Sequence, residues 1–284
     1  MPFACANTNN ISAKTEIDIS NLINTNVELS KADKELNQSY NTLIKYLTPN
    51  EIQALKEEQR TWLKERSSIF SESKDLTIIQ TFYKTRNQVL KNKLNALQEE
   101  LVKNKDKMDL ALIDFNQTFK FLGKTISPKV IAEFEIWISD RGTRPAQIAT
   151  DIAAISNHGN RYFGDFKTVK YEGDSDKDWI SMEKEDGGFV QYVWYGRLKN
   201  GLHIVQVRDN GGGTLTTLTL HAFRSTISQG LSESPDKQIR PYYRLLLEEV
   251  LQENIPLYGN LVLKDNTVTS ISDNQILWKI TFPE

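Results

Sequence analysis

The sequence predicts an α+β protein with an N-terminal helical bundle, followed by an α+β domain with a mostly antiparallel sheet and two helices. Two observations support this prediction. Residues 1 to about 107 contain no glycine and repeat their apolar side chains at steps of three and four, the period of an amphipathic helix. After that point apolar and polar residues alternate, which is the period of a strand. We therefore expect domains at 1–107 and 108–284.

Three main helices are predicted in the first half. One includes Leu29, Leu36 and Leu43 and ends near Leu47. The next begins at Pro49, because the segment 48–51 has the form of a capping box with proline at the first helical position. A third helix runs from about residue 74 to about residue 101. The lysine-rich run 103–107 is predicted to be a solvated tail or linker.

The second half is predicted to contain several short strands and two helices. The helices are expected over Pro145–Ser156 and about Tyr242–Gln252. A strand ending at the turn signal 140–142 is expected over 134–138. The remaining strands are expected over 166–173, 189–198, 201–209, 214–223, 261–271 and 275–282. Residues 200–201 and 209–213 have the composition of hairpin turns. Hairpin-linked strands interleaved with helices favour an α+β domain over a doubly wound sheet.

Composition excludes some functional classes. The chain has 284 residues, 39% hydrophobic and 25% charged, with a formal net charge of −2. A nucleic-acid partner is not expected, because binding phosphates needs a basic face. A membrane span is not expected, because no run of eighteen apolar residues occurs. The residues after Met1 do not form a signal peptide, so a periplasmic or envelope location assumes one removed before Met1. Cys5 is the only cysteine and has no intramolecular partner.

Polar residues occupy the apolar stripes of the three helices. Asp33 lies on the first stripe, Gln59 and Arg66 on the second, and Arg86 on the third. Because a buried charge is tolerated mainly when it is paired, we expect Asp33 to pair with Arg66 or Arg86. Such networks more often fix helix register than perform chemistry. The predicted structural network consists of Asp33, Asn37, Tyr40, Gln59, Trp62, Arg66, Tyr83 and Arg86.

The spacing of these residues resembles the N-terminal domain of the LprI-type lysozyme-inhibitor family. The segments LSKADKELNQSY, EEQRTWLKER and FYKTRNQVL carry the resemblance, which covers about the first hundred residues. The opening FACA also fits the family's first cysteine, at Cys5. Other cysteines of the family correspond to about Asn24, Ile69 and Ile78. None of these positions is a cysteine here, so the disulfide bonds that the resemblance would imply are missing. The resemblance implies a helical bundle from the bacterial envelope that inhibits a cell-wall-cleaving enzyme.

The C-terminal half resembles no family, and its role follows by analogy. An α+β domain without a recognised family, attached to an envelope bundle, suits an inhibitor with one dedicated protein target. That target would be either a secreted wall hydrolase or an antibacterial effector that an immunity protein blocks. Two alternatives remain open. One is an envelope adaptor or cell-wall-binding module without inhibitory activity, and the other is a hydrolase with an unrecognised site.

Catalytic and metal-binding motifs are weak. His158, His203 and His221 do not form a recognisable motif, and neither G-x-S-x-G, H-E-x-x-H nor C-x-x-C occurs. We therefore predict a protein that is not an enzyme and has no cofactor. A calcium loop would use Asp174, Asp176, Asp178 and Glu185 at its positions 1, 3, 5 and 12. Trp179 stands where that loop needs glycine, so a solvated acidic loop is the preferred interpretation.

An inhibitor needs loops that enter a partner's cleft. Backbone N–H groups and basic side chains suit the carboxylates of a wall hydrolase. Exposed aromatic residues would add binding energy, although core packing is the more common role of such residues. The candidate partner-binding residues are Arg141, Gly142, Trp179, Trp194, Tyr195, Lys199, Asn200, Asp209, Asn210, Gly211 and Gly212.

Overall fold

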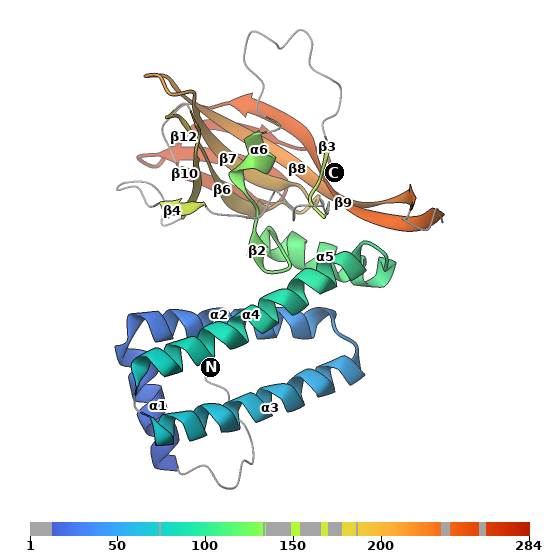
Figure 1. Cartoon of the computed structure of the whole chain (residues 1–284). Coiled ribbons are helices and arrows are strands. Elements are labelled where there is room, and N and C mark those ends of the chain that lie inside the picture. Colours follow the sequence, from blue (N-terminus) through green and yellow to red (C-terminus); the bar gives the residue numbers. More distant parts are fainter. Residues whose placement is uncertain are drawn as a thin grey trace. The chain divides into compact units, whose positions relative to one another are not determined.

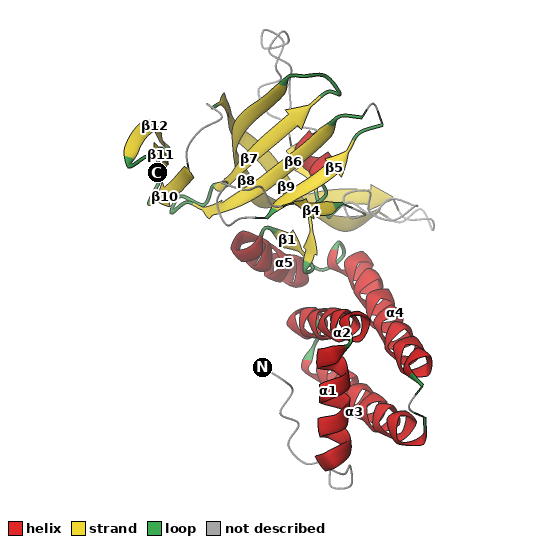
Figure 2. Cartoon of the chain, turned by 90° about the vertical axis from the view of Figure 1, so that its left-hand side faces the viewer, coloured by secondary structure: helices red, strands yellow, loops and turns green. Residues whose placement is uncertain are grey.

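The computed structural model divides the chain into two compact units, unit 1 (residues 1–97) and unit 2 (residues 98–284). It describes residues 13–73, 75–132, 134, 149–153, 166–169, 178–185, 187–233, 239–255 and 260–284, and within these ranges the side chains of all residues except 13–18 and 232–233. Helices form unit 1, and antiparallel strands dominate unit 2 (Figures 1 and 2). The predicted α+β class is therefore confirmed. None of the helices in these ranges is long and apolar enough to cross a membrane.

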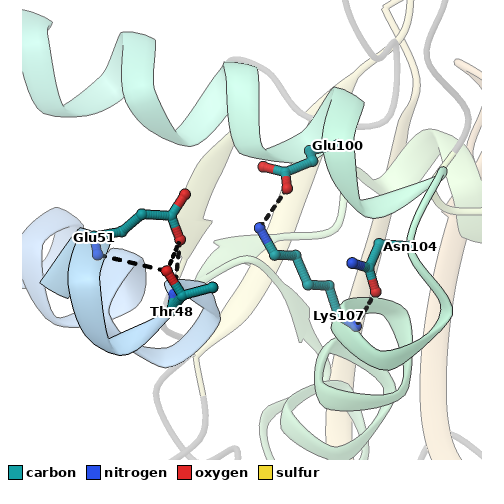
Figure 3. Close-up of polar contacts among 5 residues, drawn as sticks. All are labelled: Thr48, Glu51, Glu100, Asn104 and Lys107. Carbon is teal, nitrogen blue, oxygen red and sulfur yellow. Dashed lines mark hydrogen bonds and ion pairs between the residues drawn. The ribbon is translucent and has the colours of Figure 1, made fainter.

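Unit 1 contains α1 (Ala13–Thr25), α2 (Val27–Tyr46), α3 (Pro49–Glu72) and most of α4 (Leu76–Leu101). The predicted capping box is confirmed (Figure 3): Thr48 N–H donates to Glu51 Oε2 at 2.7 Å, and Glu51 N–H donates to Thr48 Oγ1 at 3.5 Å. Proline begins α3 because its missing N–H has no helical acceptor at that position. The short helix α1 was not among the three predicted helices.

The core of unit 1 is the predicted apolar seam of the helices. Leu29, Leu36 and Leu43 of α2 and Tyr83 and Leu90 of α4 are each no more than 2% exposed. Their spacing of seven residues, about two helical turns, brings each set to one face of its helix. Burial of these apolar side chains is the main source of the stability of unit 1, because each helix cap and each surface ion pair contributes little by itself.

A helix of unit 2 begins where a linker was predicted. Asn104 caps α5 (Lys105–Thr118), with its Oδ1 accepting from Lys107 N–H at 3.2 Å. The Lys107 ammonium donates to Glu100 Oε1 at 2.6 Å, and its residue is only 8% exposed (Figure 3). The run 103–107 is therefore not a linker, because Lys107 is buried and paired and Asn104 starts a helix, although Lys103, Lys105 and Asp106 are exposed as predicted.

Every pairing between described strands is antiparallel. A small hairpin, β1 (Lys120–Phe121) and β2 (Lys124–Thr125), precedes the short helix α6 (Pro128–Ala132). The large sheet has the order β3-β9-β8-β7-β6-β5-β4. Its strands are β3 (Ala149–Asp151), β4 (Lys167–Val169), β5 (Trp179–Glu183), β6 (Phe189–Arg197), β7 (His203–Asn210), β8 (Thr216–Glu233) and β9 (Ile239–Asn254).

A three-stranded sheet completes unit 2 and shares a core with the large one. It consists of β10 (Asn260–Lys264), β11 (Thr267–Ser272) and β12 (Gln275–Thr281). The shared core includes Ile204 and Leu220 of the large sheet, and Val268 and Phe282 from the region of the small one. The strands predicted over 189–198, 201–209 and 275–282 are confirmed within two residues at each end. The strand predicted over 214–223 continues as β8 to residue 233, and the segment predicted as one strand over 261–271 forms the two strands β10 and β11.

Both predicted helices of the second half are wrong where the structure describes them. Residues 149–151, inside the predicted helix Pro145–Ser156, form β3 and pair with β9. The segment Tyr242–Gln252 belongs to β9, which pairs with β8 over nearly its whole length. Leucine and glutamate favour helices locally, but burial of Leu245 and Leu247 on one face of the sheet overrides that preference. Phe134 is buried and lies in a turn, and the rest of the strand predicted over 134–138 lies outside the described residues.

Candidate functional site: a two-stranded arm

Four of the network residues, Asp33, Asn37, Arg66 and Tyr83, form a connected chain of polar contacts inside unit 1. Asp33 accepts hydrogen bonds from Asn37 Nδ2 at 2.9 Å and from the Tyr83 hydroxyl at 3.4 Å. Arg66 Nη1 in turn donates to the Tyr83 hydroxyl at 3.2 Å. The Trp62 ring stacks on Phe82 at 5.3 Å and meets the Tyr83 ring edge-on at 5.2 Å, while Tyr40 is buried. Tyr83 therefore links the carboxylate of α2 to the guanidinium of α3.

Arg86 has different partners. Its Nε and Nη2 donate to Gln59 Oε1 at 3.2 and 3.0 Å, and its Nη1 lies 3.5 Å from Glu58 Oε2. These contacts join α4 to α3, whereas the Asp33 contacts join α2 to α4. The stripe residues thus form two clusters that fix the register of three helices, and neither cluster contains an arrangement of nucleophile and base.

Burial dominates the electrostatics around Asp33. It raises the pKa of the Asp33 carboxyl, an effect that the Arg66 charge partly offsets. It also raises the pKa of Tyr83 to about 12, so the hydroxyl stays protonated and can donate to the carboxylate.

The raised Asp33 pKa leads to a pH-dependent stability. The folded state binds the Asp33 proton more tightly than the unfolded state does, and this difference stabilises the fold. The stabilisation is fully present below the unfolded pKa of Asp, and it is lost as pH rises through the folded pKa. We expect the free energy of unfolding of the wild type, minus that of Asp33→Asn, to be larger near pH 4 than near pH 7. Urea titrations of both proteins at the two pH values measure it. A difference that grows with pH would show that attraction to Arg66 outweighs burial.

A polar groove of about 450 Å³ lies between α2 and α4. Its lining includes Lys31, Lys84 and Lys91 together with Glu28 and Glu35. The Lys91 ammonium donates to Glu35 Oε2 at 3.1 Å across the groove. Cations and carboxylates therefore share this surface.

The predicted loop at Lys199 and Asn200 packs against the small sheet of unit 2. Lys199 N–H donates to Asp265 O at 2.9 Å, and Asn200 N–H donates to Asn266 Oδ1 at 2.7 Å. The Asn200 side chain also donates to Pro283 O at 2.8 Å. These donors are already satisfied, so the loop serves to join the sheets and its backbone is not available for a partner's carboxylates.

The loop 209–213 is exposed, but it is fixed at its base. Asp209 accepts a hydrogen bond from Lys184, and Asn210 Nδ2 donates to Thr216 Oγ1 at 3.0 Å. Asn210 Oδ1 also accepts from Gly212 N–H at 2.8 Å. Gly188, in the neighbouring turn, lies so close to Asn210 that no Cβ would fit. Gly211 to Gly213 therefore form an exposed turn whose base is held by hydrogen bonds.

The three aromatic residues predicted to contact a partner differ in how far they are buried. Trp179 is 1% exposed, so its expected role as an exposed contact is wrong; the Arg208 guanidinium lies 4.3 Å from its ring centroid. Tyr195 is partly buried and donates to Gln206 Oε1 at 2.9 Å. Trp194 is also partly buried and lines a pocket of unit 2. Alternation along the strand places these rings on different faces, a distinction that the sequence pattern alone does not make.

Other predicted positions fall partly outside the described ranges. Arg141 and Gly142 lie outside them, as do Asp174 and Asp176 of the possible calcium loop and His158. Asp178 immediately precedes β5, and Glu185 lies in the turn after it. No cluster of three or more potential ligands for a metal ion occurs among the described residues.

A two-stranded arm is another element that the sequence did not predict. We define the arm as Ile227–Glu233 of β8 with Ile239–Leu245 of β9, which pair from Ile227 with Leu245 to Glu233 with Ile239. The other strands that flank this hairpin, β7 and β3, pair only nearer its base. At about 3.4 Å per residue the arm spans about 20 Å. Figure 1 shows it extending past the rest of the large sheet.

The two faces of the arm differ in chemistry, because residues directly opposite each other share a face and successive pairs alternate. One face is mainly apolar and carries Leu231 and Ile239, which are 72% and 70% exposed. The other face carries Arg240 and Arg244. Arg244 Nη2 donates to Ser228 Oγ at 3.2 Å, and the Arg244 side chain lies beside Gly230.

Contacts at the base brace the arm. Tyr243 N–H donates to Val102 O and Ile152 N–H to Leu245 O, both at 2.8 Å. The Tyr242 hydroxyl donates to Asp151 Oδ2 at 2.9 Å, where burial raises the pKa of the Asp151 carboxyl. A two-stranded ribbon alone is at best marginally stable in water. The bracing therefore allows unit 2 to hold the arm out from the sheet.

A buried histidine connects this base to α5. Asn116 Oδ1 accepts from Ser225 Oγ at 2.6 Å and lies 3.0 Å from His203 Nε2. Because an amide oxygen only accepts, His203 carries its proton on Nε2. Burial, with a smaller effect from the Arg197 charge, lowers the pKa of His203 to about 3. The ring is therefore neutral at neutral pH and acts as a fixed hydrogen-bond donor.

Thr219, His221 and Glu249 have the connectivity of a catalytic triad, but they lie in the interior. Thr219 Oγ1 is 3.0 Å from His221 Nε2, and His221 Nδ1 is 2.7 Å from Glu249 Oε1. Thr219 is 3% exposed, and the side chains of His221 and Glu249 are 0% and 4% exposed. A reacting group must reach substrate, and this hydroxyl is covered. The arrangement is a polar network between β8 and β9.

Comparison with known proteins gives one match. The model of the family described as lysozyme inhibitor LprI matches residues 5–85, which confirms the resemblance expected for the N-terminal part of the chain. The C-terminal half has no family match. No curated protein and no solved structure matches the chain. The matched segment includes Asp33, Gln59, Trp62, Arg66 and Tyr83, and it suggests a lysozyme-inhibitor-like protein.

Proposed function

We propose that this protein is a non-catalytic envelope or periplasmic inhibitor, and that its arm enters the substrate cleft of a cell-wall-cleaving hydrolase. The family match at residues 5–85 supports the class of target. The arm is the observation that carries the mode of binding, because it is a braced projection with exposed apolar side chains on one face and arginines on the other. An antibacterial effector with the same wall-cleaving chemistry would be an equivalent target.

Charge complementarity favours such a cleft. Glycoside hydrolases that cut the wall use a pair of carboxylates flanking the scissile bond. Arginine binds a carboxylate bidentately, and Arg240 is exposed on the arm. Leu231 and Ile239 would bury apolar area beside the sugar subsites, where they replace the contacts of the substrate.

The test is inhibition of wall hydrolysis by the full chain. Clearing of a peptidoglycan suspension by a lysozyme is measured at increasing concentrations of wild type, Arg240→Glu and the double variant L231S/I239S. We expect each arm variant to weaken inhibition about 30-fold or more, as loss of a hot spot of about 2 kcal/mol would.

Matched controls exist on other surfaces. Ile276 and Leu215 are each 65% exposed and lie outside the arm, so I276S/L215S removes similar apolar area. Lys84→Glu reverses an exposed charge in the polar groove of unit 1. We expect both control proteins to inhibit like wild type. Loss of inhibition in Lys84→Glu alone would assign the inhibitory surface to unit 1, and a wild type that inhibits no wall hydrolase would reject the proposed function.

A further inference from the structure

The outer edge of β9 is covered along the arm. Tyr243 N–H donates to Val102 O, and the Leu245 carbonyl accepts from Ile152 N–H, both at 2.8 Å. Pro241, further along the same edge, has no N–H to offer a neighbouring strand. This side of the arm therefore has few main-chain groups left for another strand.

The outer edge of β8 is open along the arm. Opposite residues of an antiparallel pair either bond to each other or both direct their N–H and C=O groups away from the partner strand. The two bonded residues of β9 direct theirs away from β8, so their partners Gln229 and Ile227 direct theirs away from β9. Because the pattern alternates along the strand, Leu231 does the same. β7 pairs with β8 only as far as Phe223, and none of these main-chain groups has a hydrogen-bond partner among the described residues.

The composition of the open edge suits a further strand. Residues 225–232 contain neither a charged residue nor a proline, the two kinds of residue that protect exposed edges from pairing. The matching part of β9 contains Arg240, Pro241 and Arg244. A ribbon of two strands is marginally stable, and three or more strands with an apolar face are needed for independent stability. An added strand would therefore stabilise the arm and satisfy the main-chain groups at its open edge.

We infer that the open edge of β8 pairs with the same edge of a second copy of this chain, antiparallel and centred on Gly230. Gly230 is the middle residue of the β8 part of the arm, 227–233. A two-fold axis at this residue places Gln229 opposite Leu231 of the second copy, and Ile227 opposite its residue 233. These residues all direct main-chain groups to the open edge, so the pairing would form about eight hydrogen bonds. The same axis keeps the apolar faces of both arms on one side of the combined sheet.

A second copy fits this edge because the edge is complementary to itself. The partner strand must be antiparallel, must place no like charges opposite each other, and must offer N–H and C=O groups at every second residue. The β8 segment of another copy meets each requirement. Since the β9 edge of the described arm is covered, the pairing ends at a closed dimer. The inference does not depend on the proposed function, because no hydrolase takes part.

The first test is sedimentation equilibrium of the full chain between about 5 and 500 µM. We expect a monomer–dimer equilibrium with a Kd of about 10–100 µM, as a small interface gives. Gln229→Pro removes an N–H that the hairpin itself does not use, so we expect it to weaken dimerisation at least about tenfold. Gln229→Ala is the matched control, because it changes the same side chain but keeps the N–H, and it should dimerise like wild type. A wild type that stays monomeric at about 500 µM overturns the inference, as does equal dimerisation of the two variants.

The second test examines the register through a cross-link. Opposite residues of a non-hydrogen-bonded antiparallel pair have Cα atoms about 4.5 Å apart, a distance that a disulfide bridges. Gly230→Cys in a Cys5→Ser background should therefore cross-link two copies on mild oxidation. A Cβ at Gly230 has its nearest atoms 3.8 Å away, so the arm accommodates the substitution.

Thr226→Cys in the same background is the matched control for the cross-link. Thr226 lies on the same face of β8 as Gly230 but four residues before it, so its two copies in the dimer would be about 27 Å apart. We expect the cross-linked fraction of Gly230→Cys on non-reducing gels to be at least about five times that of Thr226→Cys. Equal fractions overturn the inference, and so does a dimer that sediments but does not cross-link at residue 230, because it uses another surface. This comparison also decides the matter if Gln229→Pro does not fold.

Discussion

Replacing Gly188 by alanine is expected to destabilise unit 2 by about 3 kcal/mol or more, and to lower the midpoint of its thermal transition by about 5–10 °C. A Cβ on this buried glycine would overlap the carbonyl oxygen of Asn210 and lie 2.6 Å from Gly212 N. Both are backbone atoms, so a rotamer change cannot relieve the overlap. The two neighbouring turns would have to separate, which would also pull apart Lys184 and Asp209.

Gly213 provides the control for this substitution. It lies in the same loop, nothing lies within 4 Å of a Cβ built on it, and its φ is not in the left-handed region. Gly213→Ala should therefore unfold within about 0.5 kcal/mol of wild type. Thermal melts followed by near-ultraviolet circular dichroism, which reports the aromatic packing of unit 2, compare the three proteins. Equal stability of the two variants would mean that the turns are not packed together in solution.

Replacing Gln59 by leucine is expected to destabilise unit 1 by about 3 kcal/mol. The Arg86 guanidinium is 8% exposed, and two of its nitrogens donate to Gln59 Oε1. Leucine fits an apolar helix face but removes the acceptor, so among the described residues the buried cation keeps its longer contact with Glu58. Removing one partner of a buried charge costs more than the hydrogen bond itself, because the remaining charge is left without solvent.

Two further variants separate this effect from a general cost of losing glutamine. Gln59→Glu keeps an acceptor oxygen and should retain most of the stability. Gln53→Leu lies on the same helix, where Gln53 is exposed and donates to Glu57 Oε1 at 2.8 Å, and should change the free energy of unfolding by less than about 0.5 kcal/mol. Urea unfolding followed by far-ultraviolet circular dichroism measures all three. A small effect of Gln59→Leu would show that water or Glu58 replaces the lost acceptor.

The helices of unit 1 could be predicted because their signals are local. The capping box at Thr48 and Glu51 depends on residues three apart, and the seam of Leu29, Leu36 and Leu43 repeats with the helical period. The partners of the polar stripe residues were harder to predict. Sequence spacing brought Asp33, Arg66 and Arg86 to the interface, but it did not indicate that Arg86 would bond to Gln59 and Glu58.

The arm was missed because its second strand has the composition of a helix. The run of leucines and glutamates at 245–249 satisfies a helical pattern, and only pairing with β8 shows that it is a strand. One signal was present: the segment begins with Tyr242 and Tyr243, and aromatic residues are more common in strands than in helices. Trp179 illustrates the same difficulty, since the direction of a strand residue depends on its register in the sheet.

The contacts that brace the arm also bear on how a newly made chain folds. Unit 1 is built from successive helices, whereas Asn116 of α5 bonds to Ser225, 109 residues later, and Asn200 bonds to Pro283, 83 residues later. Closing long loops lowers folding rates, because chain entropy is lost before the contacts form. We therefore expect the helices to form first and unit 2 to remain open until its last strands are available. Until that step is complete, the chain has its bundle but neither the arm nor its brace.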